Sequence, residues 1–213
     1  LNTFSMSINE SDYDESKWFN AVSNKFDTNH ITINLDSQNL KNESIVESIN
    51  IFDEPYSDPS TIPSYILSKE ISKNYKVAIS GDGGDELFGG YDRLRIVLQN
   101  NNLLKASLAK LYSVYPAHLG TGNRLLRNSK NINIAYPSFL EDKKLLDLLG
   151  VKAEFNFVED YLENSDDFIK NILISDIKLY LSEMMMLKVD RTSMANSLEA
   201  VSYTHLRAHE TDR

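Results

Sequence analysis

The chain has 213 residues, 41% of them hydrophobic, a formal net charge of -9 and no cysteine. These values exclude a disulfide framework, a cysteine-ligated zinc site and a thiol nucleophile within the chain, and 31 acidic against 22 basic residues argue against a nucleic-acid partner. No apolar run is long enough to span a membrane and no secretory pattern is present, so we expect a cytoplasmic protein.

The first fifty residues alternate between strand-like and helix-like patterns. Residues 3–8 and 30–35 alternate apolar and polar side chains with a period of two, which predicts two strands. Between them, acidic residues 14–15 precede apolar residues at helical spacing, which are Trp18, Phe19, Val22 and Phe26. This spacing predicts a helix, and a second helix is expected at residues 45–52.

The next thirty residues lead to a short apolar strand. Pro55, Pro59 and Pro63 fall within nine residues and predict an extended connection. The pattern of residues 64–75 is helical again, and residues 76–80 form a compact apolar run that predicts a buried strand. Strands that alternate with helices favour an α/β fold with a mainly parallel sheet, whose ligands bind at the carboxyl ends of the strands.

The strand signal ends after Tyr91, and the rest of the chain is expected to be mainly helical. Leu, Ile, Phe and Met recur at helical spacing in four segments, at residues 103–115, 140–149, 159–174 and 176–198. The pattern predicts a helical region that packs on the sheet.

Five of the eight glycines and three carboxylates lie in the segment Ser80-Gly-Asp-Gly-Gly-Asp-Glu-Leu-Phe-Gly-Gly-Tyr91, directly after the last predicted strand. Glycine lets the backbone turn at positive φ and approach a ligand closely. The carboxylates would repel a bare polyphosphate, so this composition favours a site in which a divalent cation lies between them, with Asp85 as an oxygen ligand to Mg²⁺. The spacing does not match a Walker A loop, a dinucleotide fingerprint or an EF-hand.

This segment resembles the signature of the synthetase domain of the asparagine synthase family. Two further segments resemble the same family: residues 53–60, Asp-Glu-Pro-Tyr-Ser-Asp-Pro-Ser, and residues 187–195, Leu-Lys-Val-Asp-Arg-Thr-Ser-Met-Ala. The resemblance extends over residues 1–200. It implies an ATP-pyrophosphatase fold, similar to that of the adenine nucleotide α hydrolases, with a parallel sheet, flanking helices and a mainly helical region after it.

The resemblance also implies a reaction. Aspartate is activated by ATP and Mg²⁺ as β-aspartyl-AMP, and ammonia then attacks this intermediate to give asparagine. The ammonia comes from glutamine, through a glutaminase domain of the same parent chain, and a homodimer is a further expectation.

Site residues follow from the resemblance, position by position. Met6, Ser80 and Gly81, together with Gly83 and Gly84, match nucleotide-binding positions, and Asp85 matches a magnesium ligand. Asp82 matches the position that removes a proton from the attacking nitrogen, a task that a carboxylate can perform. Glu86 and Lys188 are further catalytic candidates.

Asp190 and Arg191 are the substrate candidates near the second motif. On a helix, Lys188 and Arg191 share a face and could clamp a carboxylate or a phosphate. The alternative is that these charges form salt bridges within the protein or face solvent.

The resemblance predicts three parts of the chain. Residues 1–91 would form a partial nucleotide-binding region, residues 92–200 the helical part of the synthetase domain, and residues 201–213 a non-native tail, because the family pattern stops after Ala200. The family's pyrophosphate loop, Ser-Gly-Gly-x-Asp-Ser, does not occur in the sequence. We therefore expect the isolated chain to lack ligase activity.

Two alternatives remain open. The chain could belong to a related adenylating amidotransferase or a β-lactam synthetase-like ligase with another acyl substrate, although β-lactam synthetases have a tyrosine at the position of Asp82. It could also be a non-catalytic module that only binds the nucleotide.

Overall fold

The computed structural model describes residues 1–8, 14–35, 40, 42–99, 107–129, 131, 135–139, 149–150 and 167–202. The chain forms two compact units, one made of Leu1–Asp82 with Met185–Arg213 and the other of Gly83–Met184. The predicted non-native tail lies outside the described residues from residue 203 onward. So do most of the predicted helix at 140–149 and the first part of that at 159–174.

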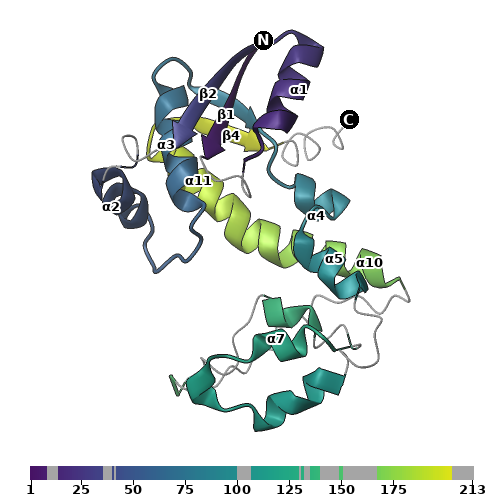
Figure 1. Ribbon diagram of the computed structural model, residues 1–213. Helices are drawn as coiled ribbons and strands as arrows, with labels where there is room; N and C mark the ends of the chain where they lie inside the picture. Colours follow the sequence, from purple (N-terminus) through teal and green to yellow (C-terminus); the bar gives the residue numbers. More distant parts are fainter. Residues whose placement is uncertain are drawn as a thin grey trace, which may run out of the picture. The chain divides into compact units, whose positions relative to one another are not determined.

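The first unit contains two pairs of parallel strands. Strand β1 (Asn2–Ile8) pairs with β2 (Asn29–Leu35), with Phe4 opposite Ile31 and Met6 opposite Ile33. Strand β3 (Val77–Ser80) pairs with β4 (Glu199–Ser202). Figure 1 shows β1 and β2 side by side, joined by helix α1 (Ser16–Phe26), as the alternating pattern predicts.

Strand β4 corrects the expectation that no strand follows Tyr91. Its register places Ser202 opposite Ser80, so Val201 and Ser202, which were assigned to the non-native tail, complete a strand of the first unit. The sequence did not indicate this strand because it has four residues and its partner lies more than a hundred positions earlier.

Three more helices complete the first unit: α2 (Asn42–Asn50), α3 (Thr61–Ser72) and α11 (Met186–Met194). Helix α3 begins at Thr61, so the prediction that Pro63 belongs to the extended connection is wrong. A proline in the first turn of a helix sacrifices no hydrogen bond, because the first N–H groups have no partner within the helix. Buried side chains of α3, including Tyr65 and Ile66, together with Leu198, form the core, and α11 packs beside α3 (Figure 1).

The second unit is helical in its described parts, as predicted. Its elements are α4 (Gly84–Phe88), α5 (Asp92–Gln99), η1 (Ala109–Val114), η2 (Ala117–Leu119), α7 (Asn123–Leu126), η3 (Pro137–Phe139), α10 (Phe168–Ser175) and η4 (Asp176–Met185), whose last residue belongs to the first unit. Segment η4 is a π-helix, and η1 to η3 are 3₁₀-helices. The core consists of Leu94, Tyr136 and Ile172, with Leu173 and Leu179 packed against them.

Candidate active site

The glycine-rich segment begins where β3 ends and contains one short helix. Gly83 has a φ of 94° and precedes α4, and Gly89 has a φ of 69° and follows it. Both values lie in the left-handed region, where a side chain would be strained. Glycine is therefore required at these two positions by the backbone itself, and the helix between them presents Asp85 and Glu86 in its first turn.

Ser80 and Asp82 belong to the first unit, at the carboxyl end of β3. The Ser80 hydroxyl is buried and has no hydrogen-bond partner among the described residues. The hydroxyl of Ser202 on the paired strand donates to the carbonyl oxygen of Asp82 at 2.7 Å, which fixes the backbone there. A buried hydroxyl without a partner is costly, so Ser80 suits a position that hydrogen-bonds a ligand.

Asp85 and Glu86 are neighbours in sequence but differ in burial. Asp85 is exposed, whereas Glu86 is 1% exposed. Glu86 accepts a hydrogen bond of 2.5 Å from the hydroxyl of Tyr91. Burial, and then this hydrogen bond, raises the pKa of Tyr91 far above its ordinary value of 10.0, so Tyr91 remains a donor at neutral pH.

Arg93 is the centre of a buried network behind this segment. Its guanidinium donates to Asp176 Oδ1 at 2.6 Å, and Tyr136 donates to the same carboxylate oxygen. The guanidinium also lies 3.8 Å from the centre of the Tyr91 ring and 4.4 Å from that of Tyr180. The network therefore ties Tyr91, and through it Glu86, to the second unit's core. Sequence reasoning missed Arg93, because Asp176 is 83 positions away.

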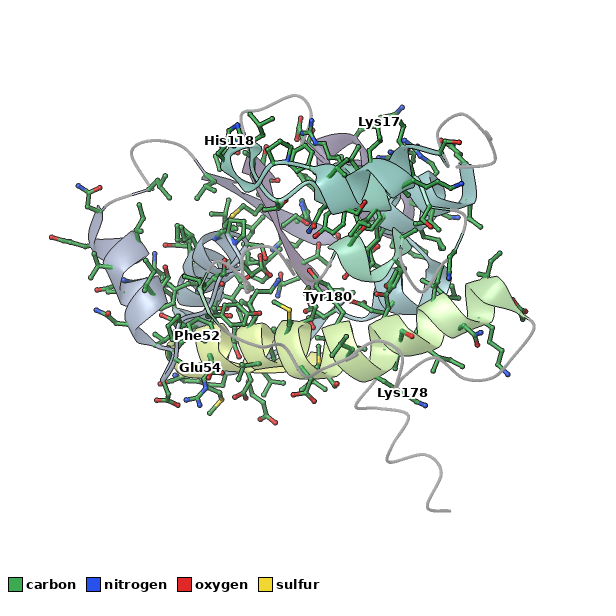
Figure 2. All side chains as sticks on the ribbon, turned by 90° about the horizontal axis from the view of Figure 1, so that it is seen from below. Lys17, Phe52, Glu54, His118, Lys178 and Tyr180 are labelled. Atoms are coloured by element: carbon green, nitrogen blue, oxygen red, sulfur yellow. The ribbon has the colours of Figure 1, made fainter. Side chains whose placement is uncertain are left out.

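Helix η4 contributes Tyr180 as well as Asp176 to this network. Figure 2 shows Tyr180 and Lys178 on opposite sides of this helix. The Tyr180 ring meets the Tyr91 ring edge-on at 5.4 Å, a favourable geometry for aromatic pairs.

Lys188, the catalytic candidate on α11, is 4% exposed and pairs with the proline-containing segment 53–60 of the same unit. Its Nζ lies 3.2 Å from Asp58 Oδ2 and 2.7 Å from Ser60 Oγ. Burial alone would raise the pKa of Asp58, but hydrogen bonds from Ser60 and the charge of Lys188 outweigh it and lower the pKa below its ordinary value of 3.8. Asp58 and Ser60 were not predicted as partners, although their segment carries the family motif.

Arg191 pairs with the same segment, and Asp190 does not. Arg191 donates to Asp53 Oδ2 at 2.6 Å, in an exposed ion pair. Figure 2 agrees, since Phe52 and Glu54, the neighbours of Asp53, lie beside α11. Asp190 instead lines a groove of about 810 Å³ in the first unit, with Lys76 and Glu199 among its other charged residues.

The predicted site residues are divided between the two units. Met6, on β1, and Ser80, Gly81, Asp82, Lys188, Asp190 and Arg191 belong to the first unit, and Gly83, Gly84, Asp85 and Glu86 to the second. Lys188 and Arg191 both reach the segment 53–60, whereas no hydrogen bond between described residues joins Ser80 or Asp82 to α11.

The donor set fits magnesium only as a partial site. Within the described part of the chain, no group of three or more carboxylate or histidine side chains could hold a metal ion. Mg²⁺ usually takes one or two protein carboxylates and completes its shell with phosphate oxygens and water. The exposed carboxylate of Asp85 therefore fits an ion that a nucleotide helps to hold, and it does not fit an all-protein cage.

Comparison with known proteins agrees with the sequence motifs. The family model described as asparagine synthase matches residues 1–202. The asparagine synthetase (glutamine-hydrolyzing) 1 of Bacillus subtilis is 32% identical over 163 residues, which are 70% of this chain and 26% of the relative. A putative asparagine synthetase (glutamine-hydrolyzing) of Mycobacterium tuberculosis is 28% identical over 171 residues, 73% of this chain and 26% of the relative.

A third relative matches a shorter part of the chain. The putative asparagine synthetase (glutamine-hydrolyzing) 2 of Methanocaldococcus jannaschii is 38% identical over 92 residues, 43% of this chain and 17% of its own length. The chain thus spans about a quarter or less of these relatives. No solved structure matches it. Among the described residues, no helix has the length and apolar character that a membrane crossing requires.

Proposed function

The chain belongs to the asparagine synthase family, and on that premise we propose that its parent protein is an ATP-dependent ligase that converts aspartate to asparagine. The observation that carries the proposal is the segment 80–91: a buried hydroxyl without a partner at the end of a parallel strand, followed by a turn that requires glycine and an exposed carboxylate. The family match is the second support.

We assign the first unit to the ATP-pyrophosphatase fold. Both of its strand pairs are parallel, and in such sheets ligands bind beyond the carboxyl ends of the strands, where Ser80 lies. Among the described residues, β1 pairs only with β2 and β3 only with β4, so each pair keeps an edge that another strand can join. The pyrophosphate loop of the intact protein would come from sequence outside these 213 residues.

The proposed reaction has two steps. In the first, a β-carboxylate oxygen of aspartate attacks the α-phosphorus of ATP, the bond to the bridging oxygen breaks, and pyrophosphate leaves. In the second, ammonia attacks the acyl carbon of β-aspartyl-AMP, AMP leaves with the oxygen that came from aspartate, and the nitrogen loses a proton. Such displacements depend on positioning and on the neutralisation of charge on the leaving group.

The residues of the chain would divide this work. Ser80, with Met6, Gly81, Gly83 and Gly84, would bind the nucleotide, and Asp82, on a backbone fixed by Ser202, would accept the proton from nitrogen. A magnesium ion held in part by Asp85 would neutralise charge on the phosphates. Glu86 would position the segment through Tyr91.

The motif around residue 190 lies on α11 of the first unit and would serve substrate binding there. Lys188 and Arg191 would hold the segment 53–60 in place. Asp190, which lines the groove of the first unit, would be the residue of this motif that meets a substrate.

The ammonia would come from glutamine. Each relative described above is named as glutamine-hydrolyzing, and the catalytic cysteine of such a domain would lie outside these residues, which contain none. We propose that the parent protein acts in the cytoplasm.

Exchange of radioactive pyrophosphate into ATP tests the first step in the full-length parent. We expect exchange that depends on aspartate and is abolished by Asp85→Ala, while Asp92→Ala, which removes an exposed carboxylate nearby, leaves it unchanged. Exchange stimulated only by another carboxylic acid would identify a related amidotransferase or a β-lactam synthetase-like ligase. No exchange with any acid would leave a nucleotide-binding module.

A further inference from the structure

Gly90 lies against Asp85, and the presence of glycine at this position is not explained by its backbone conformation. Its φ lies outside the left-handed region, unlike those of Gly83 and Gly89, so the backbone alone does not require glycine there. A Cβ built on Gly90 would overlap Oδ1 of Asp85, lie 2.9 Å from its Cγ and 3.2 Å from its Cα. The space beside Gly90 is therefore taken by the Asp85 carboxylate.

We propose that Gly90 is a positioning residue for Asp85: because it carries no side chain, the carboxylate can lie against the Gly90 backbone, in one place, before any ligand binds. This inference rests on the proposed function, in which Asp85 is a magnesium ligand. A carboxylate that is already placed loses less conformational freedom when it binds a metal than one that rotates freely.

The backbone holds the two residues together. The N–H of Gly90 donates to the carbonyl oxygen of Asp85 at 3.0 Å, and Gly89 turns the chain back at the end of α4 so that this bond can form. The residues that follow them, Glu86 and Tyr91, are also joined, because the Tyr91 hydroxyl donates to the Glu86 carboxylate at 2.5 Å. The guanidinium of Arg93 covers the Tyr91 ring. The two ends of the segment 85–91 are thus fastened to each other.

A methyl group at position 90 would collide with Asp85. The two closest atoms, Oδ1 and Cγ, belong to the Asp85 side chain, which can rotate away at a small energetic cost, and the backbone Cα at 3.2 Å needs to shift by only a few tenths of an ångström. Gly90→Ala is therefore expected to move the carboxylate without unfolding the protein. A purely structural glycine would give the opposite pattern, with lower stability and unchanged metal binding.

The test measures Mn²⁺ binding, as a spectroscopic substitute for Mg²⁺, by electron paramagnetic resonance. The full-length parent is titrated in the presence of an ATP analogue that cannot be cleaved at the α-phosphorus. We expect Gly90→Ala to weaken Mn²⁺ binding about tenfold, while its melting temperature in metal-free buffer stays close to that of the wild type. Asp92→Ala is the control and should bind Mn²⁺ as the wild type does.

The double variant separates positioning from other effects. If Gly90 acts through Asp85, then Gly90→Ala has no further effect on Mn²⁺ binding once Asp85→Ala is present. If Gly90→Ala alone proves unstable, Asp85→Ala should restore the melting temperature by removing the overlapping atoms. Instability that persists in the double variant would overturn the proposal.

Failure of this inference and failure of the proposed function give different results. Wild-type Mn²⁺ binding by Gly90→Ala, with weak binding by Asp85→Ala, overturns the positioning role and leaves the metal role of Asp85 intact. Wild-type binding by both variants overturns both roles. Aspartate-dependent pyrophosphate exchange by the wild type is measured in parallel and tests the proposed function separately.

Discussion

Each unit contains one motif segment that interacts with a buried cation. The segment 80–91 interacts with Arg93 in the second unit, and the segment 53–60 interacts with Lys188 in the first. The two cations make different kinds of contact. In the second unit, the guanidinium of Arg93 donates a hydrogen bond to Asp176 and also lies over the rings of Tyr91 and Tyr180. In the first unit, Lys188 binds Asp58 and Ser60 as a compact charge without an aromatic ring among its described contacts. A planar guanidinium can hydrogen-bond and stack at once, whereas an ammonium cannot.

The comparison shows that a cation next to a family motif need not bind a substrate. Lys188 and Arg191 share a helix face as predicted, yet both pair with carboxylates of the segment 53–60. Asp85, by contrast, belongs to a motif and is exposed. Burial and partners, which the sequence does not give, decide which charged residues remain available for a ligand.

The largest effect is expected when Arg93 is replaced. Arg93→Met should lower the free energy of unfolding by about 3–5 kcal/mol, because it leaves the carboxylate of Asp176 buried without its cation. Urea denaturation of the parent protein, followed by circular dichroism, measures this loss. The control is Arg95→Met, two residues along the same helix, whose ion pair with Asp92 is exposed. Equal losses in the two variants would contradict the assigned network.

Lys188 should come second, because its pair with Asp58 is less buried on the carboxylate side. We expect Lys188→Met to cost about 2–4 kcal/mol in the same denaturation experiment. Asp58→Asn in the Lys188→Met background should recover part of the loss, since it removes the charge left without a partner. If the Lys188→Met protein is as stable as the wild type but lacks pyrophosphate exchange, the role of Lys188 is catalytic and not structural.

The pair also predicts a dependence of stability on pH. The pKa of Asp58 is lower in the folded protein than its ordinary value of 3.8, so its contribution is fully present above that value and is lost as the pH falls through the folded pKa. The difference in stability between the wild type and Asp58→Asn should therefore shrink in acid, below about pH 4. Urea midpoints measured from pH 7 to pH 2.5 would show it, and a difference that grows in acid would refute the lowered pKa.

The smallest effect is expected at Arg191. Its side chain is 41% exposed and that of Asp53 is 81% exposed, so Arg191→Met should cost no more than about 1 kcal/mol. High salt should reduce this cost further, whereas it should barely alter the cost of Lys188→Met. A loss at Arg191 as large as that at Lys188 would mean that exposure does not separate the two cations.

Local patterns in the sequence predicted most of the elements in the first unit. The alternation of residues 3–8 and 30–35 indicated β1 and β2, and the spacing of Trp18, Val22 and Phe26 indicated α1. These three side chains are more than half exposed in the first unit. The apolar spacing therefore predicted the helix correctly but did not predict what its apolar face packs against.

Contacts between distant residues could not be predicted in this way. Strand β4 depends on a pairing between residues 77–80 and 199–202, and the Arg93 network on a partner 83 positions away. The position of Gly90 against Asp85 is local in sequence, but only the backbone geometry of α4 shows that the missing Cβ matters. The composition of the segment 80–91, by contrast, indicated from the sequence alone where the candidate site lies.

The most direct test of the central claim follows one oxygen atom. The full-length parent is supplied with aspartate labelled with ¹⁸O at both oxygens of its β-carboxylate, together with ATP, Mg²⁺ and ammonia, and the AMP is analysed by mass spectrometry. If the protein forms β-aspartyl-AMP, each AMP carries one ¹⁸O from aspartate, because that oxygen attacks the α-phosphorus and leaves with AMP. Asparagine formed together with unlabelled AMP, or with the label in a phosphate or in pyrophosphate, would contradict the account.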